Sequence, residues 1–229
     1  MELETRTINL SINKSFSVSE NDFPASRKLH RLSEEAKTSV NGESGALAYF
    51  RKSIYPLLAA TASGDVPDAL TAYGLPRAEL DAWWLDVWQL NPDWFDGPVN
   101  SEEPATEVVT FRDGSSLTLS ESRGLPSYLL RLTELEGDAE NHPSEDEDLQ
   151  VFRLYVFPKM AAGVVSDNAP TAEQVFHWPS SERMKWYEAA RRMNSDWFIS
   201  LEAASEEAQR ALAEKEKHEK KRKASKPAG

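Results

Sequence analysis

The sequence contains an internal repeat, in which two stretches about a hundred residues apart share one pattern of aromatic and charged residues. The run YFRKSIYP at 49–56 returns as VFRLYVFP at 151–158, and NPDWF at 91–95 returns as NSDWF at 194–198. The offset is 102 residues in the first pair and 103 in the second, so one inserted residue accounts for the difference. Because two copies of one pattern are expected to fold alike, this repeat constrains the architecture more than any other feature.

The repeat divides the 229 residues into two units of ordinary domain size. We predict a first repeat unit over 5–96, a linker over 97–105, a second repeat unit over 106–200, and a charged tail, helical or disordered, over 201–229. The linker contains one glycine and two prolines. Glu and Lys dominate the tail, which has few apolar residues with which to pack.

Each unit begins with alternating apolar and polar residues, the pattern of a half-buried strand. Asp113 and Gly114 separate two such runs in the second unit, and an Asp-Gly pair at this place predicts a hairpin turn. Proline-led helical sequence follows. Asn91 and Asn194 end the last helices, where Asn tolerates the left-handed conformation that closes a helix. The predicted fold class is α+β, mainly α: two tandem homologous units, each a β-hairpin followed by about three to four helices.

The net charge of the chain is −12, and it is unevenly distributed. The stretch 206–229 carries eight Lys or Arg against five Glu, which leaves the preceding body at −15. A body this acidic repels phosphate backbones, so nucleic acid is not an expected partner of the folded part. The chain has no cysteine, and no apolar run long enough to span a membrane. These features indicate a cytoplasmic protein that has neither disulfide bonds nor a membrane-spanning segment.

Positions that keep an aromatic residue in both units are most simply explained by the shared fold. Aromatic side chains bury about 150–250 Å² each, so repeated aromatic positions are what two equivalent cores require. A ligand-binding box of aromatic residues is the minor alternative. The predicted core residues are Phe50 and Phe152, Trp83 and Trp186, Trp94 and Trp197, and Phe95 and Phe198.

Two charged residues are also repeated among apolar neighbours. Because a partly buried Arg needs a carboxylate partner, we predict that Arg51 pairs with Asp93 and that Arg153 pairs with Asp196, which would tie a helix to the closing turn of each unit. The alternative is that these are exposed and unrelated charges, since most surface ion pairs are weak.

The differences between the units point to a binding surface instead. Trp88 corresponds to Arg191, so Trp88 is expected to face solvent if Arg191 does. An exposed Trp beside Trp84 would form an apolar patch of the kind that marks partner binding. The alternative is that Trp88 packs between the two units. Two further positions differ between the units: Trp84 corresponds to Tyr187, and Leu75 corresponds to Trp178. The predicted partner-binding residues are therefore Trp84, Trp88, Trp178 and Tyr187.

The residues needed for catalysis or cofactor binding do not stand out. The sequence has no glycine-rich phosphate loop and no evident nucleophile and base, and its four histidines lack metal-type spacing. The acidic run 145–148 lacks the glycine and the alternate ligands of a calcium loop, which favours a solvated charge run. We therefore expect no enzyme activity, no cofactor and no metal.

The aromatic pattern resembles tail assembly chaperones of long-tailed bacteriophages. The matching residues begin in the run at 49–56, continue through Leu75 and Pro76, and end at 94–95, and the second unit repeats them. The helix between carries Trp83, Trp84, Val87, Leu90, Asn91 and Pro92. Members of that family are small acidic proteins with helical bodies, charged C-terminal ends and no catalytic residues, whereas this chain carries the unit twice.

The resemblance implies a non-enzymatic role in virion assembly. Such a chaperone binds the long helical tape measure protein and keeps it soluble in the host cytoplasm until tail tube subunits assemble around it. The alternative function is a duplicated adaptor or structural module of a virion or host complex, with no chaperone role. A third possibility is nucleic-acid binding through the basic tail alone, which salt-sensitive DNA retention would reveal.

Overall fold

The computed structural model describes residues 3–39, 45–95, 103–167 and 169–199. It is an α+β protein, mainly helical, with two small antiparallel sheets, which confirms the predicted class. The predicted tail over 201–229 and most of the predicted linker lie outside the described residues.

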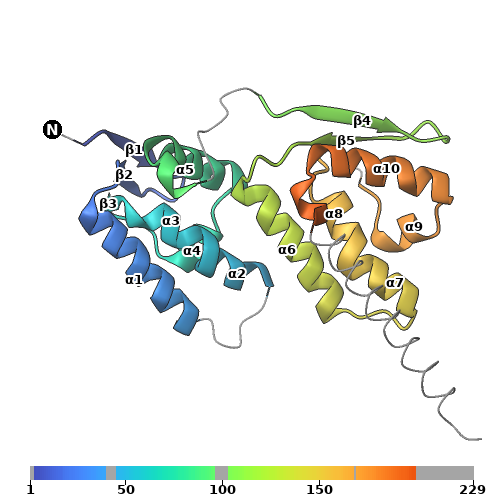
Figure 1. Cartoon of the computed structure of the whole chain (residues 1–229), viewed down its shortest axis with the longest axis horizontal. Coiled ribbons are helices and arrows are strands. Elements are labelled where there is room, and N and C mark those ends of the chain that lie inside the picture. The colour runs from blue at the N-terminus through green and yellow to red at the C-terminus, as the bar shows by residue number, and fades with distance from the viewer. Residues whose placement is uncertain (1–2, 40–44, 96–102, 168, 200–229) are drawn as a thin grey trace, which may run out of the picture.

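The first half begins with a hairpin and continues with helices that lie on one side of it (Figure 1). A short third strand pairs with the second strand of the hairpin and completes the sheet. The elements are β1 (Thr5–Asn9), β2 (Ser15–Ser19), α1 (Phe23–Ser39), α2 (Gly45–Tyr49), the π-helical turn η1 (Phe50–Ile54), α3 (Tyr55–Ala60), β3 (Ala62–Gly64), α4 (Ala69–Tyr73), α5 (Arg77–Leu90) and the 3₁₀ turn η2 (Pro92–Trp94).

The second half repeats this order of elements. Its counterpart of β3 is a single bridge between Leu119 and Val164. The elements are β4 (Thr106–Thr110), β5 (Ser116–Ser120), α6 (Pro126–Asn141), α7 (Glu147–Val151), the π-helical turn η3 (Phe152–Val156), α8 (Phe157–Ala161), α9 (Ala172–Phe176) and α10 (Ser180–Met193).

Both predicted hairpins are present, and their turns use residues that tolerate positive φ. Asn13 has φ 57° in the first turn, and Gly114 has φ 86° in the second. The register pairs Thr5 with Ser19 in the first hairpin and Thr106 with Ser120 in the second. The apolar side chains of alternate positions therefore point toward the helices in both halves.

A π-helical turn precedes a proline-containing helix at the same place in each half. Pro56 and Pro158 are the second residues of α3 and α8. The N–H of Tyr55 bonds the carbonyl of Phe50, five residues back. Proline has no N–H to donate and crowds the carbonyl four residues back, so the helix widens locally before it continues. Each proline is thus accommodated by a widened turn within one helical segment.

The halves share polar contacts as well as elements. Lys28 of α1 donates to the carbonyl of Ala62 at 2.7 Å, and Arg131 of α6 donates to the carbonyl of Val164 at 2.6 Å. Each contact ties the first long helix of a half to the strand or bridge that follows its third helical segment. The cationic residue and the accepting residue are offset by 103 and 102 positions between the halves.

The short helices α4 and α9 also begin alike. Asp68 accepts the N–H of Thr71 at 2.8 Å, and Thr171 accepts the N–H of Gln174 at 3.4 Å. The second of these is a capping box, because the Gln174 side chain accepts the N–H of Thr171 in return. Side chains of this kind satisfy donors that a helix start leaves without partners.

The expectation that Asn91 and Asn194 close their helices in the left-handed conformation is wrong. Their φ angles are −134° and −138°. Both side chains are instead buried and reach the preceding hairpin: the amide of Asn91 donates to the carbonyl of Ser19 at 3.1 Å, and that of Asn194 donates to the carbonyl of Ser120 at 3.0 Å. These bonds fix the end of each long helix against the second strand of its hairpin.

Each half has its own hydrophobic core, and α6 contributes to both. Leu130 of α6 is fully buried in the first-half core with Phe50, Trp83 and Trp84. Leu135 of the same helix packs against the second-half core. Figure 1 shows α6 between the two halves, beside α2 and α5 on one side and beside α8 on the other. The core of the first half is therefore completed by a helix from the second.

Candidate partner-binding groove

A groove of about 630 Å³ lies between the two halves. One wall comes from α3, α5 and the turn after α5, and the other comes from the β5–α6 connection, α6 and the end of α10. The large apolar side chains that line it are Leu57, Trp84, Trp88, Trp94, Phe95, Leu129, Met193 and Trp197. We call this feature the aromatic groove.

The first wall is an ordered cluster of rings. Trp84 and Trp88 lie four residues apart on α5, so they share a helix face. The turn η2 folds the chain back and places Phe95 against both: its ring is 5.0 Å from Trp84 in an edge-to-face arrangement and 5.1 Å from Trp88 in a stacked one. Such pairs add about 0.5–1.5 kcal/mol each beyond their buried area. The cluster holds Trp88 in one orientation, with its side chain half-buried.

The second wall is held by the buried Asn194. Its side-chain oxygen accepts the N–H of Ser122 at 2.7 Å, which fixes the β5–α6 connection beside the end of α10. A Cβ at Gly163 would lie 2.9 Å from the amide of Asn194 and 3.9 Å from the Trp197 ring. The same Cβ would lie 3.1 Å from the Ser120 carbonyl, so a larger residue at 163 would displace the Asn194 side chain that fixes this wall.

Charged groups of both signs surround the apolar lining. Glu121 and Arg123 form an ion pair at 3.2 Å, and Arg192 pairs with Glu107 at 2.5 Å. Asp196 is exposed at the same opening. An apolar centre with a polar rim is the usual anatomy of a protein-binding surface.

The predicted partner-binding residues do not lie together. Trp84 is only 6% exposed, so it lies at the base of the aromatic groove and offers a partner little contact area. Trp88 is half-buried between the halves although Arg191 is exposed. The inference that Trp88 faces solvent as Arg191 does is therefore wrong, because Phe95 stacks on its ring and the side chain packs against the first-half core.

Trp178 and Tyr187 lie away from the aromatic groove. The Trp178 ring is 4.8 Å from Phe111 and packs against the second-half core. Tyr187 contacts Phe198 at 5.1 Å, as Trp84 contacts Phe95 in the first half. Trp178 fills a place that the smaller, buried Leu75 takes in the first half, so its larger side chain is explained by packing.

The predicted core aromatics divide into two groups. Those on the helices and the last ring of the second half are buried: Phe50, Phe152, Trp83, Trp186 and Phe198. The others are half-buried because the aromatic groove opens over them: Trp94, Phe95 and Trp197. The groove thus uses the two closing turns, which the repeat alone assigned to the core.

Neither predicted ion pair is present. Arg153 contacts Asp138 at 3.4 Å and Glu173 at 3.5 Å, with a bond to the His142 carbonyl at 2.7 Å, and not Asp196. These partners lie on α6, at its end, and on α9, because η3 directs Arg153 into the hollow between them.

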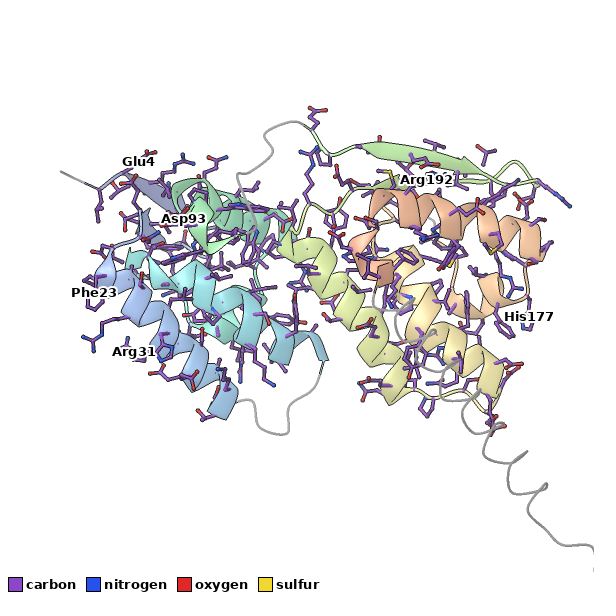
Figure 2. The ribbon with its side chains drawn as sticks, viewed as in Figure 1. Glu4, Phe23, Arg31, Asp93, His177 and Arg192 are labelled. Carbon is purple, nitrogen blue, oxygen red and sulfur yellow. The ribbon has the colours of Figure 1, made fainter. Side chains whose placement is uncertain are left out.

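Arg51 forms no ion pair with Asp93 either. Arg51 borders the equivalent hollow between α1 and α4. Asp93 is exposed in the turn η2, near α5 (Figure 2). An exposed carboxylate is solvated by water and does not require an Arg partner.

No pattern in the sequence predicted the polar contacts that join the halves. On α5, Asp81 accepts the N–H of Ser127 at 2.9 Å, at the start of α6. Further along α6, Glu134 pairs with Arg77 at 2.5 Å and accepts the hydroxyl of Tyr73 at 3.2 Å. Burial raises the pKa of Asp81, and its hydrogen bonds with Ser127 oppose that rise. Only the tertiary arrangement brings these residues together.

Two searches of the described part of the chain bear on other kinds of site. Within 3–39, 45–95, 103–167 and 169–199, no group of three or more acidic or histidine side chains is placed to hold a metal ion. Among the same residues, no helix has the length and apolar character needed to cross a membrane.

No family model matches the sequence, and neither a curated protein nor a solved structure matches it. The fold and the groove alone therefore define the class: a mainly helical α+β protein whose two halves repeat one order of elements around an aromatic groove.

Proposed function

We propose that this protein is a non-catalytic binding protein that holds a long helical protein partner in the aromatic groove. The observation that carries the proposal is the set of half-buried rings Trp88, Trp94 and Trp197, contributed by both halves to one apolar surface. Trp is enriched among the residues that dominate binding energy at protein interfaces. An amphipathic helix in an apolar groove is a common mode of such recognition.

The specific role proposed is that of a phage tail assembly chaperone, which the aromatic pattern of the sequence suggests. The partner is then the tape measure protein, kept soluble in the host cytoplasm until tail tube subunits assemble. The acidic body supports this role, because a high net charge keeps complexes apart from one another. The function needs neither a cofactor nor an enzyme activity.

We also propose that the two halves are homologous units produced by duplication, with the bounds expected from the repeat. The equivalent caps Asp68 and Thr171 and the equivalent asparagines Asn91 and Asn194 support this origin. Exchanging 68–73 for 171–176 should change the free energy of unfolding by no more than about 1 kcal/mol. A loss of cooperative folding would contradict the proposed equivalence.

The binding proposal is tested by co-expression with a tape measure protein and affinity capture of the complex. Trp88→Ala should weaken the complex at least tenfold, since truncating a central Trp commonly removes 2 kcal/mol or more of binding free energy. Phe23→Ala is the matched control, because Phe23 is an aromatic residue that is 75% exposed on α1, outside the groove.

Three outcomes separate the alternatives. Loss of the complex in Trp88→Ala with unchanged thermal unfolding supports the groove. Equal capture by Trp88→Ala and Phe23→Ala contradicts it. Detection of the protein in finished particles would favour a structural or adaptor role, because an assembly chaperone leaves the particle.

A further inference from the structure

The second half carries an apolar groove of about 240 Å³ that we call the α10 groove. It lies between η3, α8 and α10, and its main lining residues are Phe152, Val156, Met160, Arg183, Met184 and Tyr187. At the repeat offset, these positions correspond to Phe50, Ile54, Leu58, Leu80, Asp81 and Trp84 in the first half.

In the first half, α6 covers this equivalent surface. Leu130 is fully buried against it, and Asp81, which corresponds to Met184, accepts the N–H of Ser127. Near the other end of the helix, a Cβ on Gly137 would lie 3.7 Å from the Cα of Gly45 on α2. The contact face of α6 therefore combines Leu130 and Glu134 with the small residues Ser127 and Gly137, and the helix runs from α5 toward α2.

In the second half, the same surface is open among the described residues. Met184 is 45% exposed, and Val151 and Tyr155, on the helical segment that borders the α10 groove, are 55% and 54% exposed. Tyr49, the first-half counterpart of Val151, packs against the core that includes Leu130, whereas Ser53, the counterpart of Tyr155, is exposed. The second half therefore leaves two large apolar side chains, Met184 and Val151, exposed at positions that the first half covers, and this surface is a vacant helix-binding face.

We propose that residues 201–223 of this chain form the helix that docks in the α10 groove. The chain reaches the groove at the right point, because Phe198 packs on the groove residue Tyr187 at 5.1 Å. The segment carries one apolar stripe of alanine and leucine at helical spacing: Leu201, Ala204, Ala208, Ala211 and Leu212. This stripe resembles the contact face of α6. It is too weak to form a core of its own, but the groove supplies the opposing apolar surface.

The charges agree with a docked helix that runs in the direction of α6. Such a helix would place its C-terminal part near the start of α7, as α6 ends near α2. The start of α7 and the turn before it are acidic and exposed over 145–148. The later part of the segment is basic, with Lys215, Lys217 and the run KKRK at 220–223. Opposite charges thus meet at this end of the groove.

A second copy of the chain is a poorer occupant than this segment. The helix of the first half equivalent to α6 is α1, and the positions equivalent to Leu130 and Glu134 are Arg27 and Arg31. Figure 2 shows Arg31, with Phe23, on the outer side of α1, away from α6. Burying Arg27 against the apolar side chains of the groove would leave a charge without a carboxylate partner.

Disulfide trapping tests the proposal in the full-length chain, which has no cysteine of its own. Met184→Cys is combined with a cysteine on the stripe (Ala204→Cys or Ala208→Cys) or, as controls, with one on the opposite helix face (Glu206→Cys or Arg210→Cys). Because a disulfide requires Cα atoms within about 7 Å, we expect an intrachain bond to form at least tenfold faster in one of the stripe variants than in either control.

Hydrogen exchange on the unmodified chain gives an independent readout. A chain that ends at Ile199 should exchange faster than the full chain over 151–156 and 184–187, while exchange over 49–54 in the first half stays the same. Equal trapping rates for stripe and control positions, disulfide-linked dimers in place of the intrachain bond, or identical exchange in the two chains would each overturn the proposal.

Discussion

At the residue scale, two buried asparagines do more for this fold than the aromatic pattern suggests. Asn91 and Asn194 each donate to a strand carbonyl, at Ser19 and Ser120. They differ in their side-chain oxygens: that of Asn194 accepts the N–H of Ser122 at 2.7 Å, whereas that of Asn91 is buried and has no hydrogen-bond partner among the described residues. The same residue therefore contributes differently in the two halves.

This difference predicts unequal effects of alanine substitution. Asn194→Ala leaves the buried N–H of Ser122 unsatisfied, which costs about 1–3 kcal/mol in addition to the lost bond to Ser120. Asn91→Ala also removes an unsatisfied oxygen, so its cost should be smaller by about 1 kcal/mol. Urea denaturation of the two variants measures the difference. A larger loss of stability in Asn91→Ala would show that the hydrogen bonds of Asn194 are not what holds the closing turn.

Asp81 predicts a pH-dependent stability at the contact between the halves. Burial raises its pKa above the ordinary value of 3.8. The stability that the protonated side chain provides is present below that ordinary value and is lost as the pH rises through the raised pKa. Asp81→Asn, which still accepts the N–H of Ser127, should therefore be more stable than the natural chain at pH 7, and this advantage should shrink as the pH falls toward 3.8.

The measurement is the free energy of unfolding at pH values from about 3.5 to 7. This range includes the ordinary pKa of an Asp carboxyl group and the values above it. Asp93→Asn serves as the control because Asp93 is exposed, so its difference from the natural chain should stay nearly constant. A loss of stability in Asp81→Asn at pH 7 would mean that the carboxylate charge itself is needed at the start of α6.

At the element scale, α6 is the feature that the sequence could not reveal. The hairpins and helix starts are local, so alternation, Asp113-Gly114 and the prolines predicted them well. The predictions for Arg51 and Arg153 failed because pairing depends on which elements become neighbours in space. Likewise, the stripe of Leu130 and Gly137 on α6 gives no sign of which half it covers.

The close contact between α6 and α2 predicts opposite results for two substitutions of one glycine. A Cβ on Gly137 would lie 3.7 Å from the Cα of Gly45, an ordinary packing distance. Gly137→Ala should therefore stabilise the protein by about 0.5–1 kcal/mol, since glycine is unfavourable inside a helix. Gly137→Leu would force the two helices apart and cost about 1–3 kcal/mol.

Thermal unfolding measures both effects. Glu140→Leu, an exposed position on the same helix, controls for the added apolar side chain and should leave the midpoint nearly unchanged. If Gly137→Leu were tolerated as well as Glu140→Leu, α6 and α2 could not be packed as closely as the structure shows.

At the scale of the whole molecule, the first half depends on the second for its core. A fragment of residues 1–105 lacks Leu130, which is fully buried in that core, whereas a fragment of residues 1–141 retains it. Losing the contacts of a buried leucine costs about 2–5 kcal/mol, so the longer fragment should unfold at a higher urea concentration. Equal midpoints would show that the first half is complete without α6.

The aromatic groove is also a property of the whole molecule. The repeat placed Trp94 and Trp197 correctly in equivalent closing turns, yet it assigned them to cores, because a repeat shows what two halves share and not what lies between them. The half-buried position of Trp88 also escaped the repeat, since its cover comes from Phe95 in the closing turn, whereas the corresponding Arg191 is exposed.

The outer surface of the first half, on α1, differs from that of the second half, at the α10 groove. The molecule therefore has two unlike ends. In a chain that ends at Ile199, the second half presents the apolar α10 groove, whereas the first half presents Arg27 and Arg31 of α1 at the positions where α6 makes its contacts. A third module, copied from 106–199 and fused after Ile199, could therefore stack onto the chain, but one fused before Thr5 could not. Elongation of this architecture is thus possible in one direction only, as in a solenoid that already carries its polar cap.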